Sequence, residues 1–128
     1  MNKFKAQIKR ISTKDSLNIV EFNFADEHIY MMSLELKEDI LNEKNVYLGI
    51  KPMNVAIAKK FDVGMSFLNQ LKVSIVNIDE GELLCSIKGA IDGTIIESVI
   101  TKKAFLRMDL HVGDSVVMLL PASEIFIV

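Results

Sequence analysis

The chain has 128 residues, of which half are apolar and a quarter are charged, and it contains six glycines, two prolines and one cysteine. This length suits one compact domain or two very small ones and excludes a large multidomain enzyme, while the apolar content is too high for a disordered chain. The 15 basic and 17 acidic residues give a net charge of −2, so no overall positive field attracts nucleic acid or anionic lipid.

No apolar run reaches the roughly 18 to 20 residues that a membrane helix needs, and the N-terminal residues do not resemble a signal peptide. We therefore expect a cytoplasmic protein without membrane insertion. The single cysteine, Cys85, lies in an apolar stretch, and we expect a small buried side chain rather than a reactive thiol.

Apolar residues recur with period two in short runs, which is the pattern of half-buried strands. In the first half, a short helix is predicted over residues 34–41 with Ser33 as its N-cap, and Pro52 should mark a break. The predicted turns are 15–16 and 25–27, and the predicted strands are 5–11, 17–24, 28–32, 46–50 and 55–58.

The same order of elements begins again after residues 59–64. Thr101 is predicted to cap a short helix that ends at Met108. The predicted turns are 79–81, 92–93 and 112–114, and the predicted strands are 71–78, 83–87, 94–100, 115–120 and 124–128.

Matching residues support this tandem repeat: Asn2 and Asn69 differ by 67 positions, and Val55 and Ile125 differ by 70. The sequence predicts an all-β fold of two tandem OB-like five-stranded barrels with one short helix per repeat. The predicted division is a degenerate first repeat over 1–60, a linker over 61–65 and a second repeat over 66–128. Each repeat alone is a marginal domain, so we expect oligomerisation.

The chain contains no HxH, HExxH, CxxC, GxSxG, P-loop or GxGxxG motif, and its two histidines, His28 and His111, fit ordinary surface positions. These observations predict no enzymatic activity, no bound metal cation and no organic cofactor. Nine aromatic residues, none of them Trp, and the lack of an interleaved basic cluster argue against direct nucleic-acid binding.

Four motifs of the second repeat occur in an informative order, at residues 66–71, 93–101, 110–116 and 122–125. Together they resemble the TOBE-type Mop domain of the molbindins, which are small oxyanion-binding modules. The first repeat is similar more weakly, through Asn2 and residues 50–55 among others. The whole chain therefore resembles a tandem molbindin.

This resemblance implies that the barrels assemble with other copies and bind molybdate or tungstate between barrels. Backbone N–H groups, hydroxyls and one cation would hold the anion, and cavity size would exclude sulfate. Leu68 stands where the family has Arg, Ala104 where it has Ser and Pro121 where it has Lys. The implied oxyanion-binding residues are Lys51, Ser66, Leu68, Asn69, Thr101, Ala122 and Ser123.

The resulting hypothesis is a homotrimer that binds molybdate or tungstate for intracellular molybdenum homeostasis, through storage, buffering or sensing. Pairing Ser66 and Asn69 with Lys51 predicts one strong site per chain. Sensing would act through a partner, because the sequence has no helix-turn-helix segment. The alternative hypothesis is a protein-interaction or regulatory module of a molybdate transport system whose anion sites have decayed.

Overall fold

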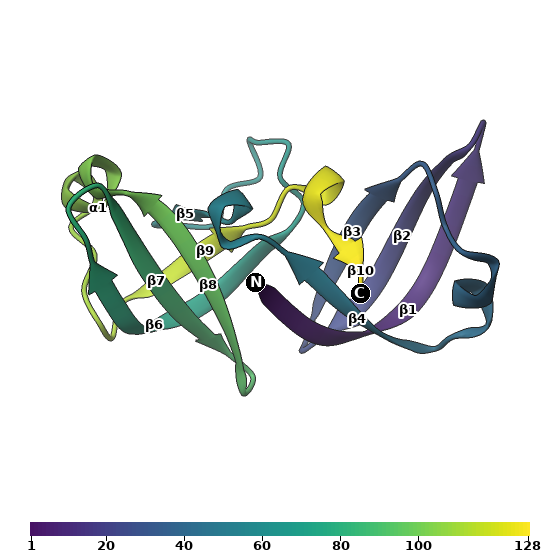
Figure 1. The fold of residues 1–128 in the computed structure, drawn as a ribbon, viewed down its shortest axis with the longest axis horizontal. Coiled ribbons are helices and arrows are strands. Elements are labelled where there is room, and N and C mark those ends of the chain that lie inside the picture. Colours follow the sequence, from purple (N-terminus) through teal and green to yellow (C-terminus); the bar gives the residue numbers. More distant parts are fainter.

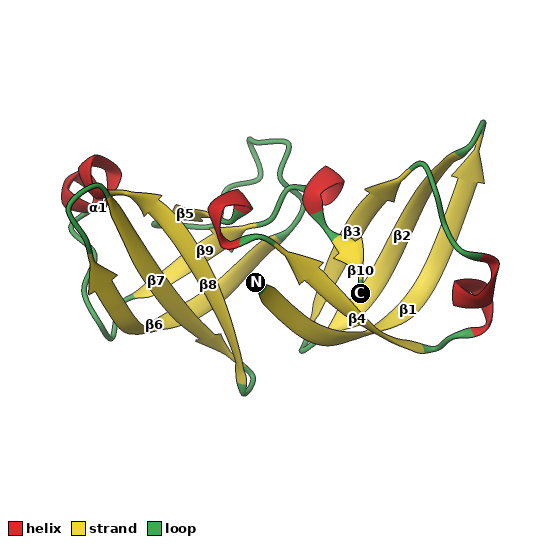
Figure 2. Cartoon of the chain, in the orientation of Figure 1, coloured by secondary structure: helices red, strands yellow, loops and turns green.

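The computed structural model describes residues 1–128, apart from the side chain at position 41. The described chain forms two five-stranded antiparallel sheets side by side, and strands account for most of it (Figures 1 and 2). The predicted all-β class with two OB-like five-stranded units is confirmed. No helix of the described part is long and apolar enough to span a membrane.

The first sheet has the strand order β10-β4-β1-β2-β3, and the second has the order β5-β9-β6-β7-β8. The strands of the first sheet are β1 (Asn2–Lys14), β2 (Leu17–Phe24), β3 (Glu27–Ser33), β4 (Asn45–Ile50) and β10 (Phe126–Ile127). Those of the second sheet are β5 (Ala56–Ala58), β6 (Gln70–Glu80), β7 (Leu84–Ile91), β8 (Thr94–Thr101) and β9 (Ser115–Leu119).

Alternation of apolar and polar residues gives each sheet one buried face. In β2, every second residue from Asn18 to Phe24 is buried, as period two predicts. Phe22 of the first sheet and Ile87 of the second are fully buried, and so is Cys85. The predicted buried cysteine is therefore confirmed.

A bulge interrupts the pairing of the first two strands of each repeat. It falls between Ile8 and Arg10 in β1 and between Ile75 and Asn77 in β6. These positions differ by the same 67 residues as the matched sequence pairs. The repeat is therefore present in backbone geometry as well as in sequence.

Each sheet takes its last strand from the other repeat. β5 leaves the first repeat and pairs with β9 of the second, while β10 leaves the second repeat and pairs with β4 of the first. Figure 1 shows the yellow C-terminal strand lying in the sheet of the purple and blue strands. The sequence ranges 1–60 and 66–128 are thus interlocked, whereas the pattern predicted that each range would supply its own five strands.

Two buried asparagines join the sheets in matching ways. Asn2, the first residue of β1, accepts a hydrogen bond from Glu97 N and donates one to Glu97 O, both at 2.8 Å. Asn69, before β6, makes the same pair of bonds with Tyr30 of β3. Glu97 and Tyr30 are also 67 positions apart, so the two contacts are repeat equivalents.

The prediction of a helix over residues 34–41 is wrong. Ser33 ends β3, and its Oγ donates to Glu35 O and accepts from Glu35 N, which forms a local turn in place of a helix cap. Only a short 3₁₀ helix, η1 (Glu38–Asn42), follows. Two similar 3₁₀ turns, η2 (Pro52–Asn54) and η3 (Ala122–Glu124), precede the exchanged strands.

The helix of the second repeat is as predicted. α1 (Lys102–Met108) begins after Thr101, whose Oγ1 accepts a hydrogen bond of 3.1 Å from Ala104 N. This side chain satisfies one of the free N–H groups of the first turn. The expectation of one short helix per repeat therefore holds for an α-helix in the second repeat only.

Candidate functional site

A cavity of about 380 Å³ lies between the first sheet and two segments of the second repeat, one just before β6 and one at the start of η3. One wall comes from β2 and β3, a second from residues 66–68 and a third from residues 121–123. The complete lining is Ile19, Tyr30, Met31, Met32, Ser66, Phe67, Leu68, Pro121, Ala122 and Ser123.

Four of the seven residues expected to bind an oxyanion line this cavity: Ser66, Leu68, Ala122 and Ser123. Two come from the segment before β6 and two from η3, although more than fifty residues separate them in sequence. The fold therefore brings together both ends of the second repeat. The other three expected residues, Lys51, Asn69 and Thr101, are not part of the lining.

Asn69 lies behind the cavity wall and not in it. Its side chain is only 1% exposed, and its Nδ2 donates to Tyr30 O at 2.8 Å and to Leu120 O at 2.9 Å. Its Oδ1 accepts from Tyr30 N at 2.7 Å. Both side-chain amide hydrogens are therefore used, and the Asn69 side chain positions the walls of the cavity.

The cavity offers uncharged donors on an apolar surface. The hydroxyls of Ser66 and Ser123 are its side-chain alcohols, apart from the phenol of Tyr30, and its described lining contains no Lys or Arg. Met31, Met32 and Leu68 supply apolar surface. A dianion here would receive hydrogen bonds from this chain but no positive charge.

A charged pair joins β1 to β2, next to the wall formed by β2 and β3. Lys9 Nζ is 3.5 Å from Glu21 Oε2, and Glu21 pairs across the strands with Tyr30. A hydrogen bond from the Tyr30 side chain, helped by the charge of Lys9, lowers the pKa of Glu21 against the opposing effect of burial. The same hydrogen bond raises the pKa of Tyr30, which therefore stays neutral.

Lys51 lies at the matching place in the other half of the molecule. It precedes η2, which packs against β8 as η3 packs against β3. The two 3₁₀ turns also touch, since Asn54 Nδ2 donates to Glu124 Oε2 at 3.3 Å. The structure of one chain does not place Lys51 in the cavity with Ser66, because each turn stays beside the N-terminal segment of its own repeat.

The two matching places differ in their side chains. Glu97 occupies the position equivalent to Tyr30, and its carboxylate accepts a hydrogen bond from the Ser86 hydroxyl. Glu97 faces Lys88 across the strands, whereas Tyr30 faces the Glu21 carboxylate, so each place has one carboxylate nearby. The place at Ser66 and Ser123 is the candidate because the hydroxyl-bearing side chains of both serines line its cavity.

Sequence reasoning missed the wall that contains Tyr30, Met31 and Met32. The reason is the strand exchange, which places η3 of the second repeat against β3 of the first. The equivalence of Tyr30 and Glu97, which share the 67-residue spacing of Asn2 and Asn69, is visible only once these contacts are known. No single-repeat pattern carries this signal.

The described part of the chain contains no group of three or more His, Cys, Asp or Glu side chains placed to hold a metal ion. His28 and His111 are both exposed. His111 lies 3.4 Å from Asp109 and 3.9 Å from Asp114, beside the turn that leads to β9.

Two comparisons found known proteins similar to this chain, one over its second repeat and one over nearly its whole length. The TOBE domain family matches residues 66–127. A crystal structure of the cytoplasmic molybdate-binding protein ModG, with molybdate bound, is similar at a TM-score of 0.87 and 21% sequence identity. The similarity covers 98% of this chain and 94% of that chain, so it includes both barrels and their fold. No curated protein matches the chain.

Proposed function

Starting from a chain whose residues 66–127 match the TOBE domain family, we propose that this protein binds molybdate in the cavity between its sheets. The observation that carries the proposal is the meeting of residues 66–68 with residues 121–123, the two segments of one TOBE domain, in a single cavity. The fold shared with ModG, which holds molybdate, supports it. The role is binding, with no catalytic step.

The donors from this chain are the hydroxyls of Ser66 and Ser123, together with backbone N–H groups of their two segments. Such donors, fixed on a rigid frame, hold a tetrahedral dianion without a basic surface. Molybdate and tungstate have nearly the same size and charge, so we propose both as ligands. The smaller sulfate ion would sit too far from donors spaced for the larger anion.

The missing positive charge is supplied by a second copy of the chain. Lys51 is exposed and free of ion pairs among the described residues, so it is able to reach a neighbouring copy. Thr101, exposed at the start of α1, is the second residue offered across such a contact. We propose a homotrimer in which these contacts close the sites, and a role in intracellular molybdenum homeostasis.

Isothermal titration calorimetry with molybdate, tungstate and sulfate tests the ligand. Heat with the first two anions and little with sulfate is the expected result. Lys51→Met keeps the apolar stem and removes the charge, and loss of one charge-assisted contact should weaken molybdate binding by about tenfold or more. Lys14→Met, at the tip of the first hairpin, is the matched control and should bind as the parent does.

These outcomes distinguish an error in the assigned residue from an error in the assigned ligand. Unchanged molybdate affinity in Lys51→Met would remove Lys51 from the site and leave the ligand standing. No heat with any of the three anions would contradict the proposed function. It would favour instead an interaction or regulatory module of a molybdate transport system, the reading that the uncharged cavity lining supports.

Assembly and ligand binding are linked if the sites close between copies. Light scattering should give three times the 14.4 kDa mass of one chain, and a single-chain mass at micromolar concentration would contradict the trimer. Molybdate at a hundredfold excess over its Kd should add about 2.7 kcal/mol of stability and raise the Tm. An equal effect of sulfate would indicate a general salt effect.

A further inference from the structure

A second cavity, of about 510 Å³, lies on the other side of β6 and has a different chemical character. Lys59 and Lys60, which follow β5, and Lys72 of β6 all line it. None of the ion pairs among the described residues involves these lysines. Three lysines therefore line one cavity in a chain with a net charge of −2, and of these the Lys59 ammonium donates a hydrogen bond of 3.3 Å to Asp109 O.

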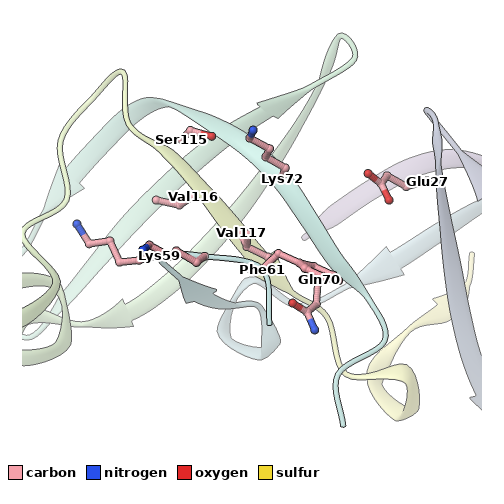
Figure 3. A pocket seen from close by; sticks show the side chains of 9 residues that line it. Glu27, Lys59, Phe61, Gln70, Lys72, Ser115, Val116 and Val117 are labelled. Carbon is pink, nitrogen blue, oxygen red and sulfur yellow. The ribbon is translucent and has the colours of Figure 1, made fainter. Parts of the chain in front are cut away.

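The floor and rim of this cavity are apolar. Val117 of β9 lies between Ala58 of β5 and Lys72 of β6 and is only 5% exposed. Phe61 stands at the rim with its side chain 64% exposed. Figure 3 shows Phe61 beside Val117 and Gln70, with Lys72 on the same sheet.

The wall that carries Phe61 is held in place before any ligand arrives. Gln70 Nε2 donates to Asp62 O at 2.7 Å and to Phe67 O at 2.8 Å, and its Oε1 accepts from Asp62 N at 3.0 Å. The Asp62 carboxylate in turn accepts from Gly64 N at 2.7 Å. An ordered wall reduces the entropy lost when a ligand binds.

A carboxylate faces the lysines from the other sheet. Glu27, at the start of β3, lines the cavity opposite the second sheet, and Figure 3 shows it standing apart from the other lining residues. Carboxylates accept hydrogen bonds from hydroxyl and amino groups. The cavity thus combines cations, an exposed aromatic ring and an acceptor.

From this combination we infer that the protein has a second binding site, for a phosphorylated ligand with a planar ring, of the size of a nucleotide. Lys60 and Lys72 bind the phosphate oxygens, and Phe61 stacks on the ring. Glu27 accepts hydrogen bonds from the sugar or ring. The volume falls in the range of about 300–1,000 Å³ typical of small-molecule sites.

Calorimetry of the full chain at low salt, with ADP, pyrophosphate and adenosine as probes, tests this site. ADP should bind more tightly than either of the other two, because only ADP engages both the lysines and the ring. The pair of changes Lys60→Gln and Lys72→Gln should weaken ADP and pyrophosphate by about tenfold or more, while molybdate affinity stays at the parental value. Lys14→Gln is the matched control for a lost surface charge.

Phe61→Ala tests the ring contact separately. It should weaken ADP by about tenfold and leave pyrophosphate unchanged, since base stacking is lost but the phosphate contacts remain. The inference is overturned if ADP gives no heat at about 1 mM, or if the double lysine variant binds ADP as the parent does. It is also overturned if ADP and pyrophosphate bind equally and Phe61→Ala changes neither. The melting temperatures of all variants check that each is folded.

Discussion

Asn69 connects all three walls of the candidate molybdate cavity through one amide group. Its bonds reach Tyr30 on the first sheet and Leu120 before η3, and its own backbone continues from Leu68. Leu120 N also donates to Asn69 O at 3.1 Å. At the residue scale, the geometry of the cavity therefore depends on a side chain that does not touch its contents.

Replacing Asn69 with Ala should lower the free energy of unfolding by roughly 2–4 kcal/mol, because it leaves buried backbone groups at Tyr30 and Leu120 without partners. It should also weaken molybdate binding. Asn2→Ala is the matched change, since Asn2 makes the equivalent bonds to Glu97 away from the cavity. Urea denaturation measures the stability of both variants, and calorimetry measures their molybdate affinity.

Asn2→Ala should lower stability while leaving the affinity of the folded protein for molybdate largely intact. Equal losses of molybdate affinity in the two variants would contradict the positioning role of Asn69. They would show that any break between the sheets has the same effect on binding.

The Glu21 and Tyr30 pair predicts a pH dependence of stability. Because the pKa of Glu21 is lowered in the folded protein, its contribution is present above the ordinary value of 4.5 and is lost as the pH falls through the folded pKa. The pKa of Tyr30 is raised, so its contribution is present below 10.0 and is lost as the pH rises through the folded pKa. Both ends of the stability profile therefore report on the same pair of neighbouring side chains.

Tyr30→Phe should move the pKa of Glu21 back toward its ordinary value, because the largest cause of the shift is removed. Carboxyl ¹³C NMR across an acid titration measures this change. Tyr47→Phe is the control, since Tyr47 is exposed and its ring lies under Lys3, 4.7 Å from the ammonium. A Glu21 pKa that is the same in Tyr30→Phe and in the parent would contradict the assigned cause.

At the scale of elements, two glycines show how closely the strands approach. A Cβ on Gly89 of β7 would lie 2.5 Å from Val73 Cγ2 and 2.9 Å from Val73 Cβ, in the core of the second sheet. A Cβ on Gly49 of β4 would lie 2.6 Å from two ring carbons of Phe126 in β10. Val73 is buried and branched, whereas Phe126 is 37% exposed and its ring is free to turn.

Gly89→Ala should therefore lower the free energy of unfolding by about 1–3 kcal/mol, the usual effect of overpacking a core. Gly49→Ala should have a smaller effect, because the ring of Phe126 moves aside. Urea denaturation of the two variants provides the comparison. A Gly49→Ala variant less stable than Gly89→Ala would show that β10 is held more rigidly than its exposure implies.

Strands were the predictable part of this fold, because their evidence is local. Alternation placed the strand at 17–24 at its observed bounds, and Asp92 with Gly93 placed a hairpin turn where both residues have positive φ. The segment after Ser33 failed because a serine before an apolar run suits a helix cap and a turn equally well. The Ser33 hydroxyl bonds to Glu35 and not to a helical N–H group.

Only part of the candidate site was predictable for the same reason. The resemblance pointed to Ser66, Leu68, Ala122 and Ser123, which the structure places in one cavity. It did not point to Tyr30, because no local pattern specifies which sheet faces a given turn. It named Asn69 as an anion donor, whereas the amide hydrogens of Asn69 are bonded to backbone oxygens.

At the scale of the whole molecule, the exchange of β5 and β10 predicts how a single repeat behaves. A fragment of residues 66–128 keeps β6 to β9 but lacks β5, and its own β10 has no β4 to pair with. Two such fragments are able to complete each other by giving β10 in place of β5. The fragment should therefore form a dimer in light scattering, and a stably folded monomer would contradict the prediction.

In the full chain, a linker joins the two repeats, so β5 pairs with β9 and β10 with β4 within one molecule. The rate of this pairing therefore does not depend on the protein concentration. The effective concentration of one barrel near the other is fixed by the linker, so dilution does not separate them. The closing contacts, such as Phe126 with Gly49, join residues that are distant in sequence, and they form only after most of the chain is ordered. Synthesis on the ribosome thus leaves the first barrel open at β4 until β10 emerges.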